Sequence, residues 1–140
     1  MYEAIRTKSV HSMAARTGDF PHRSRREELR IRLAGHLTAL LTVTDELRAL
    51  TPDPALDRAA QLLADQVTRM RDGHRPLRAA PTLPQGGSRL PQRVARLHQR
   101  AHTLAGSALV AAAACEDPAG TRLSAARLAA HAQALGIPAE

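Results

Sequence analysis

The residues of this chain that could do chemistry are concentrated in one short run, RVARLHQRAH, at positions 93 to 102. The run contains three arginines and two histidines, and no acidic residue occurs anywhere between Asp72 and Glu116. Arginine binds phosphate and carboxylate groups, whereas two histidines on one helix face can share a metal ion. The run is therefore compatible with an anion-binding surface, a metal site, a nuclease motif, or the solvated flank of a helix.

An anion-binding surface requires the least chemistry. At 100° per residue, the arginines of a helix beginning at Arg89 fall along one line beside its apolar seam. Gly86, Gly87 and Ser88 lead into this helix, whose free N–H groups favour an anion at its start. The predicted anion-binding residues are Arg75, Arg78, Ser88, Arg89, Arg93, Arg96 and Arg100.

A metal site would use His98 and His102, which are four residues apart and lie on the other side of the apolar seam, outside the core. A third ligand would have to come from His36 or His131. The segment HQRAH lacks the glutamate of zinc metalloproteases, and a neighbouring arginine repels a cation. We therefore expect no metal and no cofactor, with His98 and His102 as the best-placed ligands if one were bound.

The six residues RVARLH, from Arg93 to His98, resemble the motif of HEPN-type helical ribonucleases, in which a histidine follows an arginine at this distance. The resemblance implies a dimeric helical bundle whose arginine and histidine act on an RNA phosphate at the interface. Val94 departs from the pattern, because the family usually has a polar residue there. The chain offers no clustered carboxylates, nucleophile triad or cofactor loop, so its sequence favours a protein without enzymatic activity.

The composition of the whole chain limits the compartment and the partners. A chain of 140 residues fits one domain, and its 20 basic against 13 acidic residues favour anionic partners. Cys115 is the only cysteine, which excludes an internal disulfide and suits the reducing cytoplasm. The N-terminus does not have the pattern of a signal peptide. The most apolar run, residues 104–115, is too short to cross a membrane, so we expect a cytoplasmic protein without membrane insertion.

Apolar periodicity predicts four helices, over residues 25–50, 54–72, 89–116 and 118–135. Ser24 with Glu27 marks the first start, and prolines and glycines separate the helices. His36 occupies a seam position, where we expect a neutral, hydrogen-bonded core histidine rather than a pH switch or a ligand. The seam of the first helix comprises Leu29, Leu33, His36, Leu40, Val43, Leu47 and Leu50, and that of the last helix Leu128, Ala132 and Leu135.

Short connections within each helix pair predict an all-α four-helix bundle built from two antiparallel hairpins. Residues 24–140 would form this single domain, with a Pro- and Gly-rich crossover loop over residues 73–88. Residues 1–23 would form a basic N-terminal arm, either disordered or docked on the bundle. Because two long helices packed on two short ones leave seam surface uncovered, either this arm or a second subunit should cover it.

The function expected from these patterns is that of a non-enzymatic interaction or regulatory protein that associates as a homodimer. The alternative is binding of nucleic acid, or of another polyanion such as an acidic protein, through the arginines of the third helix.

Overall fold

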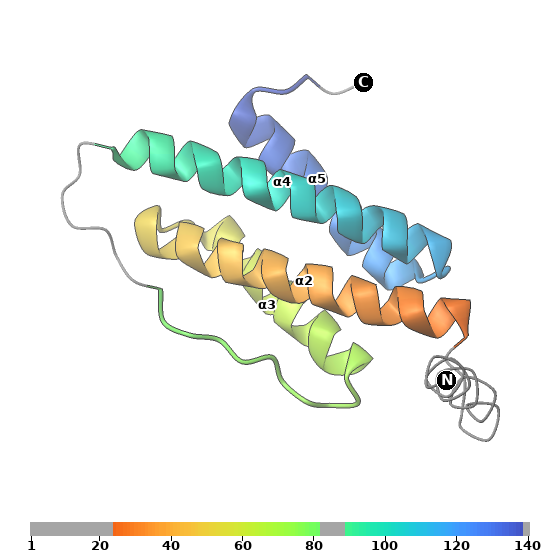
Figure 1. Cartoon of the computed structure of the whole chain (residues 1–140). Helices are drawn as coiled ribbons and strands as arrows, with labels where there is room; N and C mark the ends of the chain where they lie inside the picture. The colour runs from red at the N-terminus through yellow and green to blue at the C-terminus, as the bar shows by residue number, and fades with distance from the viewer. Residues whose placement is uncertain (1–23, 82–88, 139–140) are drawn as a thin grey trace, which may run out of the picture.

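The structure, a computed structural model, describes residues 24–81 and 89–138, and this part of the chain contains four α-helices and no strand (Figure 1). These helices are α2 (Arg25–Leu50), α3 (Pro54–Met70), α4 (Leu90–Ala114) and α5 (Pro118–Leu135). The predicted all-α four-helix fold is confirmed, although α3 and α4 are each shorter than predicted. The N-terminal arm and Ser88 lie outside the described residues.

The long helices α2 and α4 lie side by side and antiparallel, and each carries one of the short helices (Figure 1). α3 folds back on α2 and α5 folds back on α4, while α3 and α5 have only slight contact with each other. Residues 74–81 run back along the α2–α3 pair toward the end of the bundle where α4 begins (Figure 1). The two predicted antiparallel hairpins are thus confirmed.

Three of the four helices begin at a side chain that accepts a hydrogen bond from a free backbone N–H group of the first turn. The acceptors are Ser24 for Glu27 at 3.1 Å, Asp53 for Ala55 at 2.9 Å, and Asp117 for Gly120 at 3.0 Å. The fourth helix, α4, begins one residue later than predicted, with Arg89 at its N-cap and no capping side chain. The backbone N–H groups of its first turn therefore lack the side-chain acceptor that the other three helices have.

The core forms around α2, which packs against both α3 and α4. The buried apolar residues of α2 are Leu33, Ala34, Leu37, Leu40, Leu41, Val43 and Leu47. They confirm the middle of the predicted seam, while Leu29 and Leu50 at its ends are only partly buried. His36 is half-buried at the edge of the seam rather than in the core, because the leucines take the inner positions.

The predicted seam of α5 is only partly buried, and the most buried residues lie on the neighbouring side of the helix. Leu128 and Leu135 are only half-buried, whereas the fully buried residues of this helix are Gly120, Ser124 and His131. A Cβ atom on Gly120 would lie 3.0 Å from Cδ2 of Leu33. Small residues let helices approach closely, so the small side chains of α5 seat it together with Leu123 and Leu128, which pack against the core.

Replacing Gly120 with leucine is expected to lower the free energy of unfolding by about 1–3 kcal/mol, because the new side chain would overpack the junction of α2, α4 and α5. Gly35→Ala is the matched control in a helix, since no atom lies within 4 Å of the added Cβ there. This control should stabilise the protein by about 0.5–1 kcal/mol. Urea denaturation measures both effects, and equal stability of the Gly120 variant and the wild type would contradict the close approach of α5.

Candidate functional site

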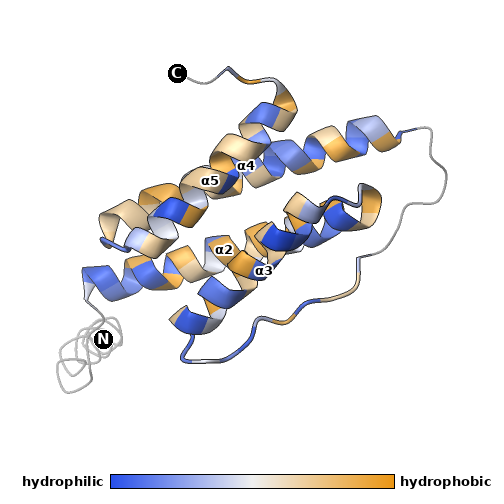
Figure 2. Ribbon diagram, turned by 180° about the vertical axis from the view of Figure 1, so that it is seen from behind, coloured by the Kyte–Doolittle hydropathy of each residue, from blue (hydrophilic) through white to orange (hydrophobic). Residues whose placement is uncertain are grey.

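Three arginines, the N-cap residue Arg89 and two residues of α4, form the most exposed part of the predicted anion-binding surface. Arg89, Arg96 and Arg100 are exposed and lie on one flank of the helix, and we call these three residues the arginine surface. None of the ion pairs within residues 24–81 and 89–138 involves them. Figure 2 shows the mainly hydrophilic character of this first half of α4. Within the described part of the chain, their charges therefore face solvent without a neutralising carboxylate.

Arg93, on the same flank, is half-buried, and its Nη2 lies 4.0 Å from Oε2 of Glu46 on α2. The opposite charge of Glu46 weakens the contribution of Arg93 to an anion site. Arg75 is exposed in the segment that follows α3. The arginine surface is therefore more compact than the set expected from the sequence.

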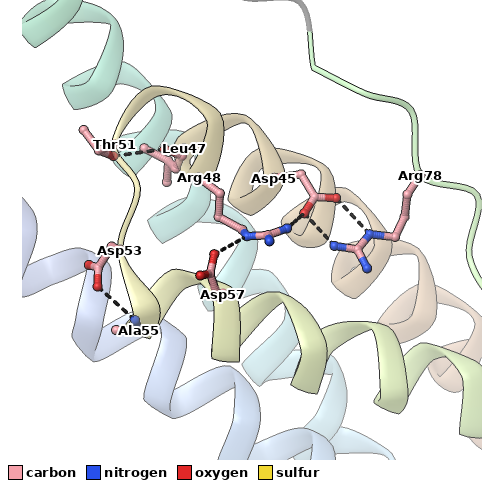
Figure 3. A network of polar contacts seen from close by, with 8 residues as sticks. All are labelled: Asp45, Leu47, Arg48, Thr51, Asp53, Ala55, Asp57 and Arg78. Carbon is pink, nitrogen blue, oxygen red and sulfur yellow. Dashed lines mark hydrogen bonds and ion pairs between the residues drawn. The ribbon is translucent and has the colours of Figure 1, made fainter.

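Arg78 is occupied by an ion pair with Asp45 of α2 (Figure 3). Its Nη2 and Nε donate to the two carboxylate oxygens at 2.7 and 3.0 Å. Asp45 also accepts a hydrogen bond from Arg48, which in turn donates to Asp57 of α3 at 2.8 Å. Burial alone would raise the pKa of Asp45, but the hydrogen bonds from these two arginines lower it. Arg78 thus anchors the segment after α3 to α2. Because its charge is paired with Asp45, Arg78 does not belong to the arginine surface.

A second polar cluster joins α4 to α5. Nδ1 of His98 lies 2.9 Å from Nδ1 of His131, and the two ring centroids are 5.2 Å apart. His131 is 1 % exposed, and its Nε2 lies 3.4 Å from Nη2 of Arg127, one turn earlier on α5. His98 is half-buried and lies outside the apolar core, as expected, but it packs against α5 rather than facing solvent. We call His98, Arg127 and His131 the histidine cluster.

The hydrogen bonds of the histidine cluster determine where its protons lie. A guanidinium group can only donate, so Nε2 of His131 accepts from Arg127. Neutral His131 then carries its proton on Nδ1 and donates it to Nδ1 of His98. A second proton on either ring would place two donors face to face. The geometry therefore requires both imidazole rings to be neutral.

Burial and neighbouring positive charges both lower the pKa of the two imidazole rings, His98 and His131. Burial, followed by the charge of Arg127 and by the two other nearby histidines, lowers the pKa of His131 to about 3. Burial and Arg127 also lower the pKa of His98. Burial lowers the pKa of Arg127 itself, with Asp53 opposing this effect. The fold therefore keeps His131 neutral at pH values below 6.5, where a histidine in the unfolded chain would be protonated. The lowered pKa of His98 acts in the same direction.

A pocket of about 330 Å³ lies beside the histidine cluster, between the α2–α3 turn and the α4–α5 hairpin. Nε of Arg127 is shielded from solvent and has no hydrogen-bond partner. The pocket combines this guanidinium group with a largely apolar wall. Its lining residues are Thr51, Asp53, Ala55, Leu56, Val94, His98, Arg127, Ala130, His131 and Ala134.

The structure pairs His98 with His131 and not with His102, the partner that the sequence spacing offered. No three His, Cys, Asp or Glu side chains in the described part of the chain are grouped so that they could hold a metal ion. Arg93 and His98, the residues of the nuclease-like motif, approach different neighbours, Glu46 on α2 and His131 on α5. The geometry therefore does not direct these two side chains toward a common phosphate.

Sequence reasoning named His98 and His131 only as possible metal ligands and missed their cluster with Arg127, because the three residues come from two helices that are far apart along the chain. Arg127 and His131 are four residues apart, which does place them on one face of a helix. Nothing in the sequence says that this face of α5 meets His98 of α4. The only available signal was a histidine and an arginine at helical spacing in an alanine-rich segment.

No protein-family model matches the chain, and comparison with curated proteins and with solved structures finds no match either. Cys115 is buried at the end of α4, with 1 % of its surface exposed. None of the described helices combines the length and the apolar character that a membrane crossing demands.

Proposed function

We propose that this protein is a non-enzymatic interaction module that binds duplex nucleic acid through the arginine surface of α4. The observation that carries the proposal is the exposure of Arg89, Arg96 and Arg100 on one flank without any ion pair in the described residues. By contrast, Arg30, Arg48 and Arg78 each pair with an aspartate. The start of α4 thus presents three such arginines along a single flank, where one external anion could contact all of them.

The spacing of the arginine surface suits a phosphate backbone. At a rise of 1.5 Å per residue, Arg89 and Arg100 are about 16 Å apart along α4. A strand of duplex DNA presents one phosphate per roughly 3.4 Å of its axis, so the surface spans about five phosphates. The three guanidinium groups can therefore each contact a different phosphate within this length.

A duplex suits this chain better than single-stranded nucleic acid. Binding of unpaired bases depends on aromatic side chains that stack on them. The chain has one tyrosine, one phenylalanine and no tryptophan, and neither aromatic residue lies in the described helices. Phosphate contacts alone read no base, so we expect binding that is insensitive to sequence.

Replacing Arg89, Arg96 and Arg100 together with glutamine is expected to weaken binding of a fluorescent DNA duplex roughly 100-fold at low salt. The estimate takes about 1 kcal/mol for each exposed charge pair. Fluorescence anisotropy measures the dissociation constant, and circular dichroism verifies that the helices remain. The substitutions lie on an exposed flank, so the stability of the fold should change little.

The matched control replaces Arg26, Arg58 and Arg122 with glutamine. These arginines are exposed on α2, α3 and α5, and the control removes the same net charge as the test variant. It should retain duplex affinity within a few-fold. Equal losses in both variants would mean that net charge, not the arginine surface, attracts the duplex, and would refute the proposal.

We also propose that the protein associates as a homodimer and that it acts in the cytoplasm. Two apolar side chains on the long helices remain well exposed, Ile31 at 52 % and Val110 at 71 %. Light scattering of the purified protein would give its mass in solution. A second subunit would double the number of arginine surfaces available to one duplex, which raises apparent affinity through multivalency.

A further inference from the structure

The geometry of the histidine cluster points to a second binding site, separate from the arginine surface. We propose that the pocket beside Arg127 binds a small organic carboxylate whose charged end meets the guanidinium group and whose short apolar body lies along Leu56 and Val94. This site takes a ligand of a few carbon atoms, so it is distinct from a surface that meets a polyanion.

The charge of Arg127, which the nearby Asp53 balances only in part, is the first argument for this site. Its guanidinium is partly buried, Nε makes no hydrogen bond, and no ion pair in the described residues involves Arg127. The one contact it makes is with a neutral acceptor, Nε2 of His131 at 3.4 Å. A partly buried cation without a carboxylate partner is costly, and a bound anion would offset that cost.

The histidine cluster holds Arg127 in place for such a ligand. Because His131 must accept from Arg127 and donate to His98, the three side chains form one chain of hydrogen bonds across α4 and α5. This chain uses Nη2 and leaves Nε without a partner. A guanidinium group has five N–H donors, so the N–H groups other than the shielded Nε would donate to a carboxylate in the pocket.

The remaining lining of the pocket selects against large or strongly charged ligands. Ala55, Leu56, Val94, Ala130 and Ala134 provide an apolar wall around a volume of about 330 Å³. Asp53 also lines the pocket, but its Oδ1 accepts the N–H of Ala55 and its charge is partly balanced by the N-terminus of α3. A monoanion with a short hydrocarbon chain fits this lining better than a phosphate dianion.

The test is titration of the full-length protein with butyrate at constant ionic strength, followed by NMR of the histidine side chains. We expect saturable shifts centred on His98 and His131. Butyramide, which has the same shape and no charge, should bind at least about 10-fold more weakly if a charge-assisted pair holds the carboxylate. Equal binding of butyrate and butyramide, or no saturable binding of butyrate, would overturn the proposal.

Two variants locate the site. Arg127→Gln removes the charge and should weaken butyrate binding at least about 10-fold. Arg122→Gln, an exposed arginine on the same helix, should leave it unchanged. If Arg127→Gln does not fold, the comparison of butyrate with butyramide in the wild type still decides the question. Undiminished binding to a folded Arg127→Gln protein would also overturn the proposal.

Discussion

Leu37→Ala is expected to lower the free energy of unfolding by about 2–5 kcal/mol, the largest effect of any single substitution considered for this protein. Leu37 is fully buried in the middle of α2, the one helix that packs against both α3 and α4. Removing its side chain deletes apolar contacts and leaves a cavity between the two hairpins. Urea denaturation followed by circular dichroism gives the change directly.

Leu62→Ala is the matched control for this loss. It makes the same chemical change on a helix, but Leu62 is 44 % exposed on α3. Its removal should cost about 1 kcal/mol or less, since little apolar surface returns to water. Similar losses at Leu37 and Leu62 would contradict the placement of the core around α2.

The second large effect is a loss of stability in mild acid. The pKa of His131 is about 3 in the fold, against an ordinary value of 6.5 in the unfolded chain. Between these two values the unfolded state binds a proton that the folded state excludes, so stability falls as the pH falls. The slope is up to about 1.4 kcal/mol per pH unit, or about 2–3 kcal/mol between roughly pH 6.5 and 4.5.

The lowered pKa of His98 adds to this dependence in the same direction. Asp45 does not interfere, because its lowered pKa makes its own contribution disappear only below its ordinary value of 3.8. Urea denaturation across this pH range would measure the slope in the wild type and in His131→Gln, which should lose most of it. His74→Gln, in the exposed segment after α3, should keep it. Stability independent of pH in the wild type would contradict a neutral, buried His131.

The fold of α2 could be predicted almost entirely from the sequence, because one strong physical signal defines it. Leucines and a valine at helical spacing mark its buried face, and Ser24 with Glu27 marks its start. α5 could not be predicted in the same way. Its buried face is formed by Gly120, Ser124 and His131. A search for apolar residues at helical spacing does not detect such a face, because its residues are small or polar.

The two candidate sites also differ in how far the sequence predicts them. The arginine surface follows from spacing along one helix, so sequence reasoning could place Arg89, Arg96 and Arg100 together. It could not see that Arg78 is taken by Asp45, because that contact depends on the path of the segment after α3. The histidine cluster likewise depends on how α5 packs against α4, which no local pattern specifies.

The salt dependence of duplex binding by the wild-type protein tests the central claim most directly. Three phosphate contacts give a slope of about −2.7 for the logarithm of the association constant against the logarithm of the salt concentration. Affinity should therefore fall about 40-fold between roughly 50 and 200 mM salt. A slope near this value, reduced toward zero in the variant lacking Arg89, Arg96 and Arg100, is the result we expect. Binding that does not change with salt, or no binding at low salt, would contradict the proposed function.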